Sequence, residues 1–191
     1  MEAGKNIVGC YVGLEPRERI EFLYHHYDNL DVFRQAYKES VVNMIAYMRA
    51  YDRSQDKLEG IQKTRNLLNS ITESAAFERI VISEYFEQNK PSDELVEEEE
   101  DKDIISWAIF EWHLMKSEFD IFKNFLNMLS TRDRRILTAY IGHSKSVKEI
   151  AKELDIEKES AEKRIYRIKQ KLIENMMPIL PEYGFNLVYA S

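Results

Sequence analysis

The sequence predicts an all-α protein, in which an N-terminal helical bundle precedes a C-terminal group of short helices. With 6 Gly and 4 Pro in 191 residues, the chain carries few turn signals. Apolar residues recur at spacings of three and four along much of its length, as in helices with one buried face. The sequence contains no alternating apolar pattern long enough for a sheet. Composition and periodicity therefore indicate a helical globular protein.

The N-terminal domain is expected to cover residues 1–90 and to contain four helices. Pro16 suits the first turn of a helix over Arg17–Tyr27. Apolar spacing predicts a long helix from Asp31 to about Tyr51, another between Leu58 and Ile71, and a fourth over Ser74–Gln88. The apolar side chains of the fourth helix are Phe77, Ile80, Val81 and Tyr85.

An acidic segment over residues 91–103 is the expected linker. It opens with Pro91 and Ser92, and a run of carboxylates that repel one another follows. The same carboxylates would suit the first turn of a following helix, because the helix dipole favours negative charge there. The sequence is compatible with both interpretations, a solvated linker and an acidic helix start.

A long amphipathic helix is expected over residues 104–128, where the apolar spacing is the most regular in the chain. Spacings of 3, 4, 3, 4, 3, 4 and 3 residues define a heptad seam over residues 105–129. The seam could join two copies in a homodimer or pack on the N-terminal helices. Phe119 and Phe122 are bulky for a tight two-stranded seam and favour packing within the chain. The seam consists of Ile105, Ala108, Trp112, Met115, Phe119, Phe122, Leu126 and Leu129.

Residues 129–177 are expected to form three helices, the first two with clear local signals. Ser130 or Thr131 can cap the first helix, and Gly142 ends it. The second helix covers Val147–Leu154 and keeps a small residue, alanine, on its apolar face, where a partner helix must approach closely.

The third of these helices is expected to run from Glu159 to about Met176, after a turn over residues 155–157. A short helix, a tight turn and a longer basic helix make up a helix-turn-helix, whose second helix fits the major groove of DNA. A plain three-helix element with solvated pairs, such as Glu159 with Lys163, is the alternative. The buried face of the third helix is expected to comprise Ala161, Ile165, Ile168 and Leu172.

The candidate DNA-binding residues lie mainly on the other face of that helix. Lys158 and Lys163 can donate to guanine or reach phosphate, while Glu159 and Glu162 can accept from cytosine. The arginines and the remaining lysine are better placed for phosphate, which supplies salt-dependent affinity and little sequence preference. The full set is Arg132, Lys158, Glu159, Glu162, Lys163, Arg164, Tyr166, Arg167 and Lys169.

The charge distribution fits a nucleic-acid interface at this end of the chain. The net charge is −7, but residues 127–177 contain 12 Lys and Arg against 8 Asp and Glu. The remainder of the chain then carries −11. A basic segment behind an acidic body can orient a protein on DNA. The carboxylates of residues 91–103 could also act as an arm that competes with DNA for the basic face.

Residues 129–172 resemble region 4 of sigma-70 family factors, which reads the −35 promoter element. The resemblance implies that Lys158, Glu159, Glu162 and Lys163 face promoter bases and that Arg132 touches phosphate. The matching positions are Leu129, Arg132, Asp133, Ile136, Leu137, Glu149, Ile150, Ala151, Leu154, Lys171 and Leu172.

Two departures from the family pattern concern the start of the recognition helix. Asp155, Ile156 and Glu157 stand where many members have Gly, Ile and Ser, so the helix cap is weaker here. Ala161 replaces a larger Val or Ile. These departures affect the DNA sequence preference rather than the fold.

The size and layout of the chain are similar to phage and prophage late-gene regulators of the ArpU type. These combine a divergent helical N-terminal part with a sigma-region-4-like end. The segment before Ile104 has no resemblance to sigma region 2. This second resemblance is one of organisation.

The expected function is that of a sigma-factor-like transcription regulator, which binds double-stranded promoter DNA and acts with bacterial RNA polymerase. One alternative is a helical protein-interaction module, anti-sigma-like or an adaptor, that binds polymerase or another factor and not DNA. A second alternative is a true sigma factor with a disguised region 2, which would need promoter-specific initiation with core polymerase alone.

The sequence contains no pattern typical of a catalytic site. We therefore expect no enzyme activity, no cofactor and no metal site. Cys10 is the one cysteine, which excludes an internal disulfide. No apolar run reaches the roughly 18 residues of a membrane span, and the N-terminus lacks a signal-type stretch, so we expect a cytoplasmic protein.

The C-terminal tail, residues 178–191, is expected to pack on the body of the protein or on a partner. Pro178 and Pro181 stop the preceding helix. The residues that follow are too apolar for a free tail, with Phe185, Leu187 and Val188 among them.

Overall fold

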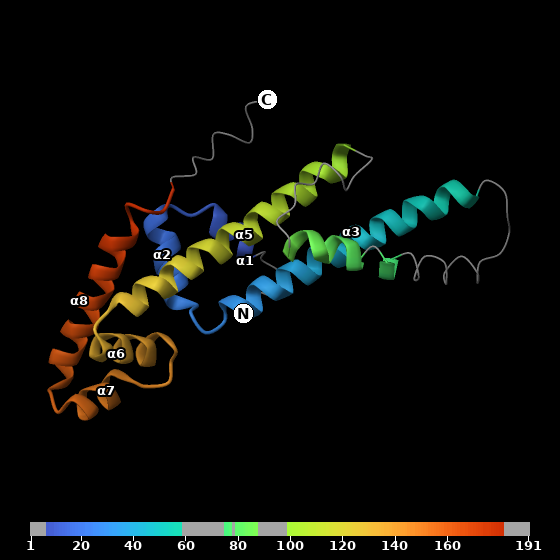
Figure 1. Ribbon diagram of the computed structural model, residues 1–191. Coiled ribbons are helices and arrows are strands. Elements are labelled where there is room, and N and C mark those ends of the chain that lie inside the picture. Colours follow the sequence, from blue (N-terminus) through green and yellow to red (C-terminus); the bar gives the residue numbers. More distant parts are fainter. Residues whose placement is uncertain (1–6, 59–74, 78, 88–98, 182–191) are drawn as a thin grey trace. The chain divides into compact units, whose positions relative to one another are not determined.

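The computed structural model describes residues 7–58, 75–77, 79–87 and 99–181, and helices are the regular structure throughout these ranges (Figure 1). None of the described residues lies in a β-strand, so the all-α prediction is confirmed. None of the described helices is long and apolar enough to cross a membrane. The helices are α1 (Ile7–Val12), α2 (Pro16–His25), α3 (Leu30–Leu58), α5 (Glu99–Met128), α6 (Thr131–Ile141), α7 (Val147–Leu154) and α8 (Lys158–Met176).

Helices α2 and α3 begin close to where the sequence places them, whereas α1 was not expected and two further details differ. Helix α3 continues to Leu58, several residues beyond the expected end. Residues 75–77 and 79–87 are helical. Their buried side chains are Ala75, Ile82 and Phe86, whereas Phe77 is 65% and Ile80 61% exposed. The apolar residues therefore cover more than one helical face, and spacing alone did not identify the buried one. The helix expected between residues 58 and 71 lies almost wholly outside the described residues.

The chain divides into two compact units that do not follow the linear order of the expected segments. One unit combines residues 1–32 with residues 114–191, and the other comprises residues 33–113. The boundaries fall inside α3 and α5. The first 32 residues therefore belong with the C-terminal helices, because α1 and α2 pack on α5 and α8 of that unit.

Helix α5 begins inside the segment that was expected to form the acidic linker. Helix α5 begins at Glu99, so residues 99–103 of the expected linker are helical. Residues 91–98 lie outside the described part of the chain.

Trp112 of α5 stands at the centre of the core of the unit formed by residues 33–113. Its indole ring lies perpendicular to the ring of Phe86, with 5.9 Å between centroids. Its Nε1 donates to the carbonyl oxygen of Arg34 at 3.1 Å, and the Arg34 guanidinium lies 4.5 Å from the ring centroid. The buried core around Trp112 comprises Val41, Val42, Ile45, Ala46, Ala75, Ile82, Phe86, Ile105, Ala108 and Ile109.

A buried guanidinium connects three segments of the other unit. The Arg19 side chain of α2 is 1% exposed, and its Nε donates to Oε2 of Glu118 on α5 at 3.0 Å. Its two terminal nitrogens donate to the carbonyl oxygens of Leu14 at 3.1 Å and Pro181 at 2.6 Å. The Tyr11 hydroxyl donates to the same Glu118 oxygen. Burial is the main reason that the pKa of Tyr11 is raised, which keeps this hydroxyl protonated as a donor.

The contact with Pro181 also bears on the C-terminal tail. Leu180 is buried, and Pro181 accepts the hydrogen bond from Arg19. The beginning of the tail therefore packs on the body of this unit, as expected from its apolar composition. Residues 182–191 lie outside the described part of the chain.

The heptad seam of α5 is buried by the chain itself. Its members from Ile105 to Leu126 are all at most 4% exposed. Ile105, Ala108 and Trp112 belong to the core of residues 33–113, and Phe119 and Phe122 contact the Tyr27 ring at 5.8 and 6.1 Å. A homodimer through the seam would need these side chains to be exposed, so the structure supports packing within the chain.

Removing the Arg19 side chain should destabilise the protein through the charge left behind on Glu118. We expect Arg19→Met to lower the free energy of unfolding by about 3–5 kcal/mol, because a buried carboxylate loses its cation. The double variant Arg19→Met/Glu118→Met should recover much of this loss. Urea denaturation of the full chain, followed by far-ultraviolet circular dichroism, measures both. Equal losses in the single and double variants would contradict the assigned role of the ion pair.

Candidate nucleic-acid interface

Capping residues determine where α6 and α7 begin. The Ser130 hydroxyl accepts from the backbone N–H of Asp133 at 3.1 Å and starts α6. Ser146 and Glu149 form a reciprocal capping box at the start of α7, where the Glu149 carboxylate accepts from the Ser146 N–H at 2.7 Å. That backbone N–H, together with the Ser146 hydroxyl, lowers the pKa of Glu149. Both helices match the expected bounds, because short-range hydrogen bonds determine them.

Gly142 ends α6 where a side chain would not fit. A Cβ atom at this position would lie 2.9 Å from the carbonyl oxygen of Thr138 and 3.0 Å from Oδ1 of Asp28. The backbone of Gly142 itself has an ordinary φ of −80°. The glycine is therefore favoured by the close approach of the Thr138 carbonyl oxygen, with the carboxylate of Asp28 beside it, and not by backbone strain.

The turn between α7 and α8 is tight and is formed with a non-glycine residue. Asp155 adopts a left-handed conformation with φ of 53°, which Asp tolerates better than most residues. The N–H of Ile156 donates to the carbonyl oxygen of Ala151 at 3.1 Å and closes the end of α7. Glu157 stands at the N-cap of α8 without a side-chain cap bond, as expected from the missing serine.

Helix α8 separates an apolar face from an exposed polar edge. Its inward side chains, Ala161 among them, are buried, and α8 packs on α6 and α7. Lys158 forms an ion pair with Glu162 at 3.2 Å, and Tyr166 is 62% exposed. We name the exposed side chains the reading edge. It comprises Lys158, Glu159, Glu162, Lys163, Tyr166 and Arg167.

Arg164, expected to contact phosphate, is instead engaged within the unit. Its Nε and one terminal nitrogen donate to Oδ1 of Asp133 at 3.0 and 2.8 Å. The other Asp133 oxygen accepts from the Ser130 hydroxyl at 2.9 Å. Arg164 therefore joins α8 to the first turn of α6. The match of Asp133 to the opening pattern did not reveal this pairing, because its partner lies 31 residues away.

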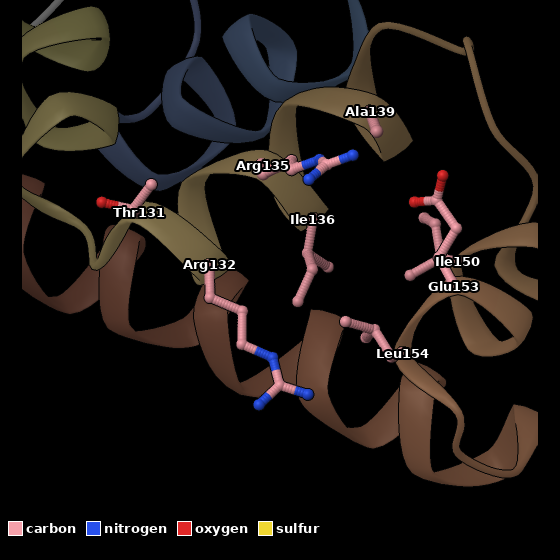
Figure 2. Close-up of a pocket in the computed structure, with 8 residues that line it drawn as sticks. All are labelled: Thr131, Arg132, Arg135, Ile136, Ala139, Ile150, Glu153 and Leu154. Atoms are coloured by element: carbon pink, nitrogen blue, oxygen red, sulfur yellow. The ribbon is translucent and has the colours of Figure 1, made fainter.

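Lys169 also lies off the reading edge. Its Nζ is 4.0 Å from a carboxylate oxygen of Glu21 and 4.8 Å from the centroid of the Tyr24 ring, both on α2. Packing on α2 leaves the side chain 21% exposed. The sequence contained no signal that α2 would lie beside α8. Arg132, by contrast, is exposed on the first turn of α6 (Figure 2).

Among protein families, the model described as Sigma-70, region 4, matches residues 119–172. The C-terminal region carries a sigma-70 region 4 helix-turn-helix domain. Domains of this kind serve DNA-binding transcription regulation, associate in general with RNA polymerase, and are regulatory rather than enzymatic. The match covers a little over a quarter of the chain and starts at Phe119, so it includes the end of α5 as well as the expected three helices. Comparisons with curated proteins and with solved structures found no match.

Within the described ranges, the structure brings no three His, Cys, Asp or Glu residues together as a metal site. The exposed side chains of α8 offer hydrogen-bond donors, hydrogen-bond acceptors and charge. The reading edge carries three cations and two carboxylates, and Arg132 adds a cation from α6. This arrangement can contact both base edges and phosphates.

The Asp133–Arg164 pair should make stability depend on pH in the acid range. Burial alone would raise the pKa of Asp133, but hydrogen bonds from Arg164 and Ser130 outweigh it and hold the pKa below its ordinary value. The stabilisation is therefore present above about pH 4 and is lost as the pH falls through the lowered pKa. We expect Asp133→Asn to cost about 1 kcal/mol at neutral pH, since both side chains are about one-third exposed.

Urea denaturation of the full chain between neutral and acid pH measures this effect. The difference between the original protein and Asp133→Asn should narrow toward low pH. Glu174→Gln, which removes an exposed carboxylate of α8, is the control and should show no such narrowing. A constant difference at every pH would contradict the role of the charged pair.

Supplying the missing cap should stabilise the start of the recognition helix. We expect Glu157→Ser to raise the free energy of unfolding by about 0.5–1 kcal/mol, because a serine hydroxyl can accept a free N–H of the first turn of α8. Glu157→Ala, which removes the carboxylate without adding a cap, is the control. Urea denaturation compares the two, and an equal effect of both substitutions would refute the capping argument.

Proposed function

We propose that this protein regulates transcription by binding double-stranded promoter DNA through the reading edge of α8, while contacting bacterial RNA polymerase. The observation that carries the proposal is the exposure of the reading edge on a helix whose opposite face is buried in a region-4 domain. Recognition helices of helix-turn-helix units place such an edge in the major groove, with their N-terminal residues nearest the bases.

The roles of the individual residues follow from their positions. Lys158, Glu159, Glu162 and Lys163 occupy the first turns of α8 and are proposed to read bases. Arg167, farther along α8, and Arg132 on α6 are proposed to contact phosphates. Arg164 and Lys169 are proposed to act indirectly, since their charged groups hold α8 against α6 and α2.

The charge balance supports a defined orientation on DNA. Residues 127–177 are basic within a chain of net charge −7. Repulsion between the acidic remainder and the phosphates would favour approach through the region-4 domain. The layout is also that expected of a late-gene regulator of the ArpU type, which we retain as a prediction.

The second candidate function is a protein-interaction module that binds polymerase or another factor and not DNA. The net charge of −7 favours it. A salt titration on a promoter-length duplex separates the two functions, because a DNA binder loses affinity steeply as salt rises. A true sigma factor would in addition initiate at a promoter with core polymerase alone.

Lys158→Ala and Lys163→Ala should each weaken binding to a promoter duplex by about 1 kcal/mol or more, because each removes a donor from the first turns of α8. A lysine that contacts phosphate should also lower the salt slope by about 1. Fluorescence anisotropy of a labelled duplex measures both quantities. Lys123→Ala on α5, which removes the same charge outside the helix-turn-helix, is the control. If both α8 variants keep the original affinity and an unchanged circular dichroism spectrum, the assignment of the reading edge is refuted.

A further inference from the structure

Helix α2 packs on the recognition helix, although it lies far from residues 119–172 in the sequence. Both helices belong to the compact unit that combines residues 1–32 with residues 114–191 (Figure 1). A sigma-70 region 4 match that begins at residue 119 does not include α2. The surroundings of α8 therefore contain an element that the matched family does not supply.

Tyr24 stands at the centre of this contact. Its side chain is 4% exposed, and Nζ of Lys169 on α8 lies 4.8 Å from the centroid of its ring. The ring of Tyr140 on α6 lies 6.4 Å away on centroids. A cation is attracted to the face of an aromatic ring, and the attraction is stronger when water is excluded. Tyr24 therefore connects α2 to both α6 and α8.

The ring of Tyr24, rather than the carboxylate of Glu21, supplies the main attraction on Lys169. The Glu21 oxygen is 4.0 Å from Nζ, and the Glu21 side chain is 40% exposed. Exposed ion pairs of this kind contribute little, because water and salt screen them. The same Glu21 oxygen also faces Arg17 at 3.7 Å. The ring is buried and has no such competitor on its side of the contact among the printed ion pairs of α2.

Helix α8 is thus held by charged side chains at two different points along its length. Arg164 is bound by Asp133 of α6, and Lys169 is held by α2. The two positions are five residues apart, which is about 7.5 Å along the helix axis. A helix that is held at one point can tilt about it, whereas a second point fixes its direction. The contact with α2 supplies that second point.

A small tilt of α8 would displace the reading edge by more than a hydrogen bond tolerates. Lys158 precedes Arg164 by six residues, so a tilt of about 10° about Arg164 moves it by about 1.5 Å. Binding groups must be held to within about 0.5 Å of their productive positions. The direction of α8 therefore determines which base edges the reading edge can reach.

We propose that Tyr24 is a positioning residue of the DNA-binding unit, which holds Lys169 and thereby sets the direction of α8 and the sequence preference of its reading edge. The inference rests on the proposed function for its DNA readout. It extends the DNA-binding unit from the matched residues to α2, which does not itself touch DNA.

Two nitroxide labels measure the direction of α8 without DNA. They are attached at Lys163→Cys on α8 and Asn124→Cys on α5, both exposed, in the full chain with Cys10→Ser. Pulsed electron paramagnetic resonance gives the distribution of distances between them. Tyr24→Leu should widen or shift this distribution, and Tyr24→Phe, which keeps the ring, should leave it as it is. An unchanged distribution in Tyr24→Leu overturns the proposal.

A second variant approaches the same contact from α8. Lys169→Met keeps the length of the side chain and removes its charge, so it should alter the label distances in the same way as Tyr24→Leu. The double variant should add little to either single change, because both remove one contact. Circular dichroism checks that each variant is folded. Additive effects of the two substitutions would contradict the assigned contact.

A DNA measurement separates positioning from stability. The probes are a duplex enriched from a random library by the original protein and a scrambled duplex of the same composition, both followed by fluorescence anisotropy. Tyr24→Leu should lower the ratio of the two affinities about fivefold or more, because contacts to base edges are misplaced. Affinity for the scrambled duplex should change less than about twofold, because it depends on phosphate contacts. An unchanged ratio, or equal losses on both duplexes, overturns the proposal.

Tyr27→Leu is the matched control for this measurement. Tyr27 lies in the same segment but contacts Phe119 and Phe122 of α5. The substitution should lower stability in urea and leave the affinity ratio unchanged. If the original protein enriches no duplex, the proposed function fails, and the label distances still decide whether Tyr24 positions α8. If it enriches a duplex and Tyr24→Leu keeps the full affinity ratio, only the role of Tyr24 is refuted.

Discussion

The buried ion pair between Arg19 and Glu118 holds together the unit that carries the region-4 domain. A guanidinium at 1% exposure is stable there only because each of its nitrogens has an acceptor, on α5, in the turn after α1 and in the segment after α8. These three acceptors come from distant parts of the chain. Arg19 thereby determines that α2 packs against α5 and beside the end of α8.

The position of α2 in turn completes the surroundings of the helix-turn-helix. The Tyr24 ring lies beside Tyr140 of α6 and beneath Lys169 of α8, and Asp28 approaches Gly142 at the end of α6. Residues far outside the family match are therefore part of the packing of the matched domain. This arrangement explains why the N-terminal 32 residues fall in the same compact unit as the C-terminal helices.

The cations of helix α8 differ in their surroundings, because some are engaged in packing and others remain exposed. Arg164 and Lys169 are held by carboxylates of α6 and α2 and orient the helix. Lys158, Lys163 and Arg167 remain exposed on the opposite edge.

The sequence by itself determined the class of fold, the bounds of α6 and α7 and the exposed edge of α8. These features depend on interactions within a few residues, such as the Ser130 and Ser146 caps, and on helical periodicity. Tertiary structure decided the pairings of Arg164 with Asp133 and of Arg19 with Glu118, which are 31 and 99 residues apart. Charged residues occur throughout the chain, so type and spacing could not select these partners. Only the packing of the helices brings particular charges together and removes them from water.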